Sequence, residues 1–169
     1  ASLTVTQIKK NGGSNSSVSS GSSYNSSGTA VTGTYGTLTI GADGSYTYAA
    51  TADAADGIAS GETANDVFVY TLSDGTETTT ANITITILGE NDSPIAQNDV
   101  GVIMEGSTLT VANSANANVS GSFDATGEHS GDVIDTSSSS HTDTDPDTSN
   151  TLTITHIKKD GGSNSTVSS

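Results

Sequence analysis

The chain has 169 residues, of which 31% are hydrophobic and 4% aromatic, so its core must be thin and built mainly from Val, Ile, Leu and Ala. The absence of cysteine excludes disulfide bridges, and no apolar run approaches the ~20 residues that a membrane-spanning helix needs. The net charge is −15, and the 18 acids between residues 11 and 157 have no Lys or Arg among them. This excludes a nucleic-acid or anionic-membrane surface and leaves divalent cations as the expected counter-charge.

Two stretches of the chain carry nearly the same sequence. LTVTQIKKNGGSNSSVSS (3–20) and LTITHIKKDGGSNSTVSS (152–169) begin 149 residues apart and are identical at 14 of 18 positions. Leu and Val alternate with Thr at the start of the repeat, which predicts a strand over residues 2–8 and a second one from residue 152. The chain therefore reads as one period of a tandem array, followed by the first strand of the next copy.

Two hairpins are expected in the first half of the chain. The polar stretch 11–33 reads by itself as a linker or a disordered segment, and an extended β-arm or a surface loop are the alternatives. Residues 35–50 alternate around an Ala-Asp-Gly turn and predict a hairpin. Residues 56–66 form a loop of turn-forming residues. Residues 67–92 predict a second hairpin with its turn at Asp74-Gly75, and its alternating aromatic, Leu and Ile side chains are the strongest core signal in the sequence.

The second half is more polar. Two short strands are expected around 100–104 and 108–112, joined by a turn at Glu105-Gly106, and the turn-rich residues 113–150 lead back to the repeated strand. Several short alternating strands at this spacing predict an all-β protein with a β-sandwich of immunoglobulin or cadherin type. A parallel β-helix would need a short coil-to-coil period, and the sequence has none below 149 residues.

The domain boundary is expected near residue 93. Residues 1–92 would then be most of one β-sandwich repeat, and residues 93–169 would be the N-terminal part of the next. In the alternative, a single domain straddles this point and residues 152–169 are a spare strand.

Roughly residues 35–100 resemble the VCBS repeat of giant bacterial (RTX-type) adhesins. The resemblance is carried by the run YGTLTIGADGSYTYAA…GETANDVFVYTLSDGTETTTANITITILGENDSPIAQND. The resemblance implies tandem immunoglobulin- or cadherin-like sandwiches in long secreted or cell-surface proteins. Such proteins are exported by type I secretion and serve adhesion or biofilm formation. GENDSP also resembles the cadherin D-x-N-D-x-P linker, and DTDPD resembles the cadherin D-x-D element. In that family these segments bind calcium between successive domains.

Oxygen-bearing side chains are concentrated where this resemblance implies calcium (Ca2+). Calcium takes six to eight oxygen ligands from carboxylates, amides and main-chain carbonyls. In an extended segment, the alternate acids of DTDPD would share one side, repel one another without a cation and form a ligand set with one. Loops at the same end of the sandwich could bring further acids to the linker. The expected ligands are Glu90, Asn91, Asp92, Asn98, Asp99, Asp143, Asp145 and Asp147, with Glu62, Asp66 and Asp74 in second rank. The alternative is that acidic loops simply keep a secreted protein soluble.

The function expected from these features is that of a non-enzymatic extender repeat in a secreted or cell-surface adhesin, stiffened by calcium at the junctions between repeats. Its partners would be neighbouring repeats or identical subunits, with cell-surface or matrix ligands left to other regions and no nucleic acid or membrane insertion. The alternative is a subunit of a self-assembled extracellular fibre, in which residues 11–33 or the repeated strand add to a neighbour's sheet edge. A carbohydrate-binding module would need exposed aromatic side chains.

Overall fold

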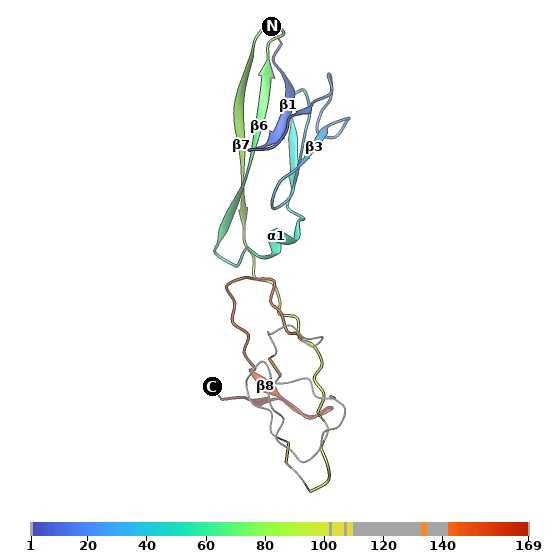
Figure 1. Cartoon of the computed structure of the whole chain (residues 1–169), viewed down its shortest axis with the longest axis vertical. Coiled ribbons are helices and arrows are strands. Elements are labelled where there is room, and N and C mark those ends of the chain that lie inside the picture. Colours follow the sequence, from blue (N-terminus) through green and yellow to red (C-terminus); the bar gives the residue numbers. More distant parts are fainter. Residues whose placement is uncertain (1, 102, 107, 110–132, 135–141, 169) are drawn as a thin grey trace. The chain divides into compact units, whose positions relative to one another are not determined.

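The computed structural model describes residues 2–101, 103–106, 108–109, 133–134 and 142–168. The chain forms two compact units, Ala1–Asn91 (unit 1) and Asp92–Ser169 (unit 2). Both are drawn in Figure 1, and each is described here by itself. The division falls beside residue 93, and the assignment of the two units to successive repeats stays a prediction.

Unit 1 is an all-β sandwich, which confirms the predicted fold class. One sheet has the strand order β2-β1-β6-β7 and the other has the order β3-β4-β5 (Figure 1). Every described strand pair is antiparallel. The elements of unit 1 are β1 (Thr4–Lys10), β2 (Ser16–Ser17), β3 (Thr29–Thr32), β4 (Thr37–Ile40), β5 (Tyr46–Ala49), α1 (Asp53–Asp56), β6 (Thr63–Ser73) and β7 (Thr78–Leu88).

The β6–β7 hairpin contributes two of the four strands of the larger sheet. Its two strands of 11 residues pair along their whole length, from Thr63↔Leu88 to Ser73↔Thr78. The turn between them contains Gly75 at a φ of 94°, a conformation that glycine adopts without steric cost. The first strand begins four residues earlier than predicted, because its inward position 66 is an aspartate. A polar residue at an inward position hides the period of two from a search for apolar alternation.

The core lies between the two sheets of unit 1. Phe68 and Tyr48 meet edge to face, with ring centroids 6.2 Å apart and an interplanar angle of 64°. On the edge strand β7, Ile83 and Ile85 are only half-buried. The side chains that are buried in this core are Val5, Ile8, Val18, Leu38, Ile40, Ala42 and Phe68.

Residues 11–33 are part of the sandwich. They contribute β2 and β3, and β3 pairs with β4 over four residues. Hydrogen bonds add to the apolar contact of Val18 with the core: the Ser22 hydroxyl donates to the Ser19 carbonyl at 2.6 Å and accepts from the Ala42 amide at 3.0 Å. The predictions of a linker and of disorder are therefore wrong, because this stretch contributes two strands to the sandwich.

Unit 2 has little regular structure among its described residues. It contains β8 (His156–Ile157) paired with β9 (Ser165–Thr166), and an isolated bridge between Ile95 and Thr144. A turn is present at Glu105-Gly106, as predicted. No strand is assigned to the described residues of 100–104 and 108–112, and most of 113–142 lies outside the described residues.

Candidate metal centre

Asp66 is a structural residue of the sandwich interior. Its side chain is 1% exposed, and its carboxylate accepts hydrogen bonds from the amides of Thr34 and Tyr35 and from the hydroxyl of Tyr48. The donor–acceptor distances range from 2.7 to 3.0 Å. A Cβ on Gly33 would collide with this carboxylate, so the β3–β4 turn can approach β6 only through a glycine. Asp66 thus joins the two sheets, and its oxygens are already engaged by protein donors.

The electrostatics of this pair follow from burial and hydrogen bonding. Burial raises the pKa of Asp66, but the hydrogen bonds from Tyr48, Thr34 and Tyr35 together outweigh it and hold the pKa of that carboxyl below its ordinary value. Burial, and then the hydrogen bond to Asp66, raises the pKa of Tyr48 well above its usual range. The folded state therefore favours an ionised Asp66 beside a neutral Tyr48.

We expect unit 1 to be most stable between roughly pH 4 and pH 10. The contribution of Asp66 to the free energy of unfolding is full above the ordinary carboxyl pKa. It is lost as the pH falls through the lowered pKa of the folded state. The contribution of Tyr48 is full below the ordinary tyrosine pKa and is lost as the pH rises towards the raised folded value. Urea midpoints followed by circular dichroism from pH 2 to 12 test this. In Tyr48→Phe, the urea midpoint should fall less at alkaline pH than it does in the unmodified chain. An equal fall in both proteins would contradict the role given to Tyr48.

The other two second-rank residues lie at opposite ends of β6. Asp74 sits in the β6–β7 turn, where the amides of Glu77 and Thr76 donate to it at 2.8 Å and lower its pKa. Glu62 precedes β6, and its carbonyl accepts a hydrogen bond from the amide of Gly89. The 11 residues of β6 separate the two acids, so the expectation that they converge at one end of the sandwich is wrong. Asp74 has a local role as a turn residue.

One residue of the first predicted acidic cluster, Asp92, meets the DTDPD segment in unit 2. The amide of Asp92 donates to Oδ2 of Asp147 at 3.0 Å, and the amide of Gln97 donates to Oδ1 of Asp143 at 2.8 Å. Between these contacts, Ile95 and Thr144 exchange main-chain hydrogen bonds of 2.7 and 3.0 Å. The segment that follows the unit boundary is therefore paired with the DTDPD segment.

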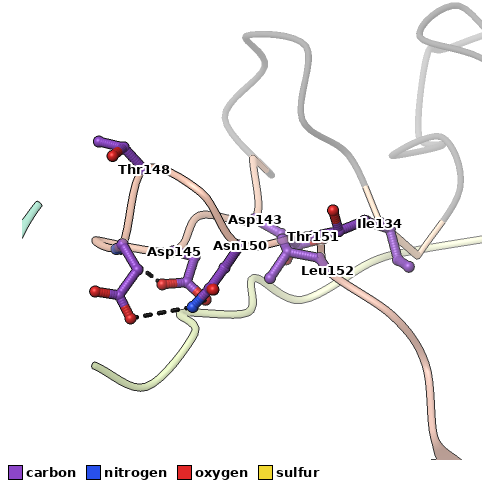
Figure 2. A pocket seen from close by; sticks show the side chains of 8 residues that line it. Ile134, Asp143, Asp145, Thr148, Asn150, Thr151 and Leu152 are labelled. Carbon is purple, nitrogen blue, oxygen red and sulfur yellow. Dashed lines mark hydrogen bonds between the residues drawn. The ribbon is translucent and has the colours of Figure 1, made fainter. Parts of the chain in front are cut away.

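The DTDPD segment does not run straight. Oδ1 of Asp145 accepts from the amide of Asp147 at 2.9 Å, a local turn that bends the chain after Pro146. Asp143 and Asp147 are buried and Asp145 is half-buried. Figure 2 shows Asp143, Asp145 and Asn150 among the residues that line an open pocket beside this turn. The predicted extended arrangement, with three carboxylates in a row, is replaced by a turn.

One oxygen of this turn has no hydrogen-bond donor in the described part of the chain. Asp147 is 2% exposed; its Oδ2 accepts from the side-chain amide of Asn150 at 3.0 Å as well as from Asp92, but its buried Oδ1 accepts no hydrogen bond. A buried, unpartnered carboxylate oxygen is costly, and a cation is one partner that satisfies it. The donor set of carboxylate and amide oxygens is of the type that calcium takes.

The predicted ligands do not all gather at this turn. Among the described residues, no three or more His, Asp or Glu side chains are arranged as a ready metal-binding group. The remaining predicted ligands lie on the segment around the boundary: Glu90 and Asn91 end unit 1, Asn98 is exposed, and Asp99 is half-buried. The structure thus brings Asp92, Asp143, Asp145 and Asp147 together and leaves the others outside this turn.

Comparison with known proteins gives one family. Residues 1–89 match the bacterial cadherin-like domain, which covers all the strands of the sandwich and more than half of the 169 residues. No curated protein and no solved structure matches the chain. In the described part of the chain no helix has the length and apolar character needed to cross a membrane. The sandwich of unit 1 and this match together place the chain in the family of bacterial cadherin-like domains, whose fold is a non-enzymatic, structural one of extracellular adhesion type.

Proposed function

We propose that the chain is a calcium-stiffened extender repeat of a large secreted or cell-surface adhesin of the VCBS type. In this proposal its array is exported by type I secretion, holds adhesive regions away from the cell and supports attachment or biofilm formation. Family membership supports the structural, extracellular part of the proposal. The calcium part is carried by one observation: in a turn with two other aspartates, the buried Oδ1 of Asp147 has no hydrogen-bond donor among the residues that the structure describes.

Calcium would be held by the residues of this turn. Asp143, Asp145 and Asp147 supply carboxylate oxygens, and Asn150 lies beside them as an amide donor or ligand. Because the amide of Asp92 is bonded to Asp147, a cation here would order the first residue after unit 1. That is the physical basis for stiffening, since the cation would fix the short segment that follows unit 1.

The expected result is a calcium-dependent gain in the stability of unit 2. Extracellular calcium modules bind with a Kd of roughly 0.1–1 mM, and saturation at 100 times Kd adds about 2.7 kcal/mol. Thermal unfolding of the full chain should be followed by circular dichroism in 10 mM calcium and in chelator. All five tyrosines lie between residues 24 and 70, so tyrosine fluorescence reports on unit 1 alone and serves as an internal reference.

Asp147→Asn is the deciding variant. It should abolish the calcium-dependent gain and keep the stability measured in chelator, since it removes a charge that repels its neighbours when no cation is bound. Asp53→Asn, at an exposed acid of α1, is the matched control and should respond to calcium like the unmodified chain. Identical unfolding of the unmodified chain in calcium and in chelator, together with identical small-angle scattering profiles, would end the calcium proposal.

A further inference from the structure

The turn that follows β1 contains the one Asn-Gly pair of the sequence, Asn11-Gly12. The amide of Gly13 donates to the carbonyl of Lys10 at 2.8 Å and closes this turn, in which Gly12 has a φ of 78°. The amide of Asn11 is fixed to β6 by a hydrogen bond of 2.9 Å to the carbonyl of Val67. Asn11 and Gly12 therefore stand at a defined, exposed bend of the chain.

The groups of this pair that can react with each other are not engaged elsewhere. Among the residues that the structure describes, neither the side-chain amide of Asn11 nor the main-chain amide of Gly12 takes part in a hydrogen bond. A Cβ built on Gly12 would meet no atom within 4 Å, so the space beside it is open to water. Glycine also leaves its own nitrogen uncrowded, because it has no side chain. No hydrogen bond of these two groups has to break before the Gly12 nitrogen approaches Cγ of Asn11.

A bond between these two atoms closes a five-membered succinimide ring, and a nucleophile within the same chain has a large advantage over one from solution. The Gly12 nitrogen gives up its proton to a base in solution and attacks Cγ of Asn11. The bond from Cγ to the side-chain nitrogen breaks, and ammonia leaves after taking up a proton from water. Water then opens the ring at either carbonyl. One opening gives aspartate at residue 11; the other routes the main chain through the former side chain and gives isoaspartate.

We propose that Asn11 is a site of spontaneous covalent modification, which converts it to aspartate and isoaspartate as the protein ages. The reaction needs only this turn and water, so it proceeds without an enzyme, an oxidant or a reductant. Because the attacking nitrogen must first lose its proton, the reaction is faster at higher pH.

The second copy of the repeated sequence shows that the aspartate product fits the turn. Asp160 stands at the position that corresponds to Asn11. The amide of Gly162 donates to the carbonyl of Lys159 at 2.8 Å, the same closing hydrogen bond with the same length as in the first copy. Conversion to aspartate therefore keeps the turn and adds one negative charge beside the two lysines of unit 1.

Isoaspartate changes the turn itself. It places one additional methylene in the main chain between the anchored amide of Asn11 and the amide of Gly13 that closes the turn. The next strand, β2, pairs with β1 over two residues only, so a longer turn disturbs a short strand pair. The two products therefore differ in their effect on unit 1, and isoaspartate is the one that weakens it.

Other exposed asparagines of unit 1 have groups that are already engaged. The side-chain amide of Asn15 donates to Oε1 of Gln7 at 3.0 Å, and the residue that follows has a side chain. Oδ1 of Asn25 accepts from the Ser23 hydroxyl at 2.8 Å, and the next nitrogen, that of Ser26, donates to the Ser23 carbonyl at 3.1 Å. Both should convert several-fold more slowly than the Asn-Gly pair, and they serve as internal references.

Incubation of the full chain at 37 °C and at pH 6 or pH 9 tests the proposal. Digestion after lysine and tyrosine then gives fragments 11–24 and 25–35, which together contain all three asparagines. Mass spectrometry should show a gain of one mass unit at Asn11 that grows with time and is several-fold faster at the higher pH. Protein isoaspartate methyltransferase, which methylates isoaspartate but neither aspartate nor asparagine, should label fragment 11–24 and not fragment 25–35.

Asn11→Gln and Asn15→Gln are matched variants for this experiment. Glutamine would have to close a six-membered ring, so Asn11→Gln should lose the methylation of fragment 11–24, whereas Asn15→Gln should keep it. Equal conversion at Asn11 and Asn15, or methylation that persists in Asn11→Gln, would overturn the proposal. Incubation in urea measures the reaction of the unfolded chain. A folded chain that stays unconverted while the unfolded chain reacts would overturn the proposal too, because the turn would then protect the pair.

Discussion

Replacing Asp66 with alanine is expected to lower the melting temperature of unit 1 by roughly 12–24 °C. The substitution leaves the amide of Tyr35 and the hydroxyl of Tyr48, both on half-buried residues, without their acceptor, whereas the amide of the exposed Thr34 can turn to water. An unsatisfied buried donor costs about 1–3 kcal/mol, so the two donors of Tyr35 and Tyr48 together cost about 3 kcal/mol. A domain of this size has about 5–14 kcal/mol in all, and unit 1 should remain folded but marginal.

The comparison with Asp66→Asn and Glu77→Ala separates this effect from a general loss of acid. Asparagine keeps one acceptor oxygen but points an N–H donor at other donors. The stability of Asp66→Asn should therefore lie between that of the alanine variant and that of the unmodified chain. Glu77 is exposed, and its truncation should change stability by no more than about 0.5 kcal/mol. Urea unfolding followed by tyrosine fluorescence measures all three, and an unchanged midpoint for Asp66→Ala would contradict the sheet-joining role.

The part of the fold that apolar alternation predicts is the β6–β7 hairpin and its turn. Phe68 and the isoleucines of β7 repeat with a period of two, and Asp74-Gly75 supplies the turn chemistry. The stretch 11–33 could not be predicted in this way, because Val18 and Val31 are its only apolar contributions to the core cluster, and hydrogen bonds of Ser22 and main-chain pairing supply further restraints. The pattern of apolar residues indicates where a core can form, but it does not indicate which groups the polar side chains and the main chain bond to.

The candidate site shows the same limit of sequence reasoning. The resemblance of DTDPD to the cadherin element directs attention to a turn that does contain a buried, unpartnered carboxylate oxygen. The bend after Asp145 depends on a hydrogen bond from the amide of Asp147, which spacing alone does not indicate. The role of Asp66 was missed because its partners lie 18 to 32 residues away in sequence. The sequence does contain a signal for this role. Asp66 stands two residues before Phe68, so the two side chains lie on the same, inward face of the strand.

Phe68→Ala is expected to destabilise unit 1 as strongly as the loss of Asp66. Phe68 is 0% exposed and packs edge to face on Tyr48, whose hydroxyl reaches Asp66. Truncation of a buried phenylalanine costs about 3–5 kcal/mol, of which the cavity is one part. The remainder here includes about 0.5–1.5 kcal/mol for the aromatic contact that positions Tyr48.

The matched control is Tyr46→Ala, which removes an aromatic side chain that is 49% exposed on β5. Its cost should be a small fraction of that of Phe68→Ala, because most of its ring is already in contact with water. The double variant Phe68→Ala/Asp66→Ala should lose less than the sum of the two single losses, since both act through the position of Tyr48. Strict additivity in urea unfolding would show instead that the ring and the carboxylate stabilise the two sheets independently of each other.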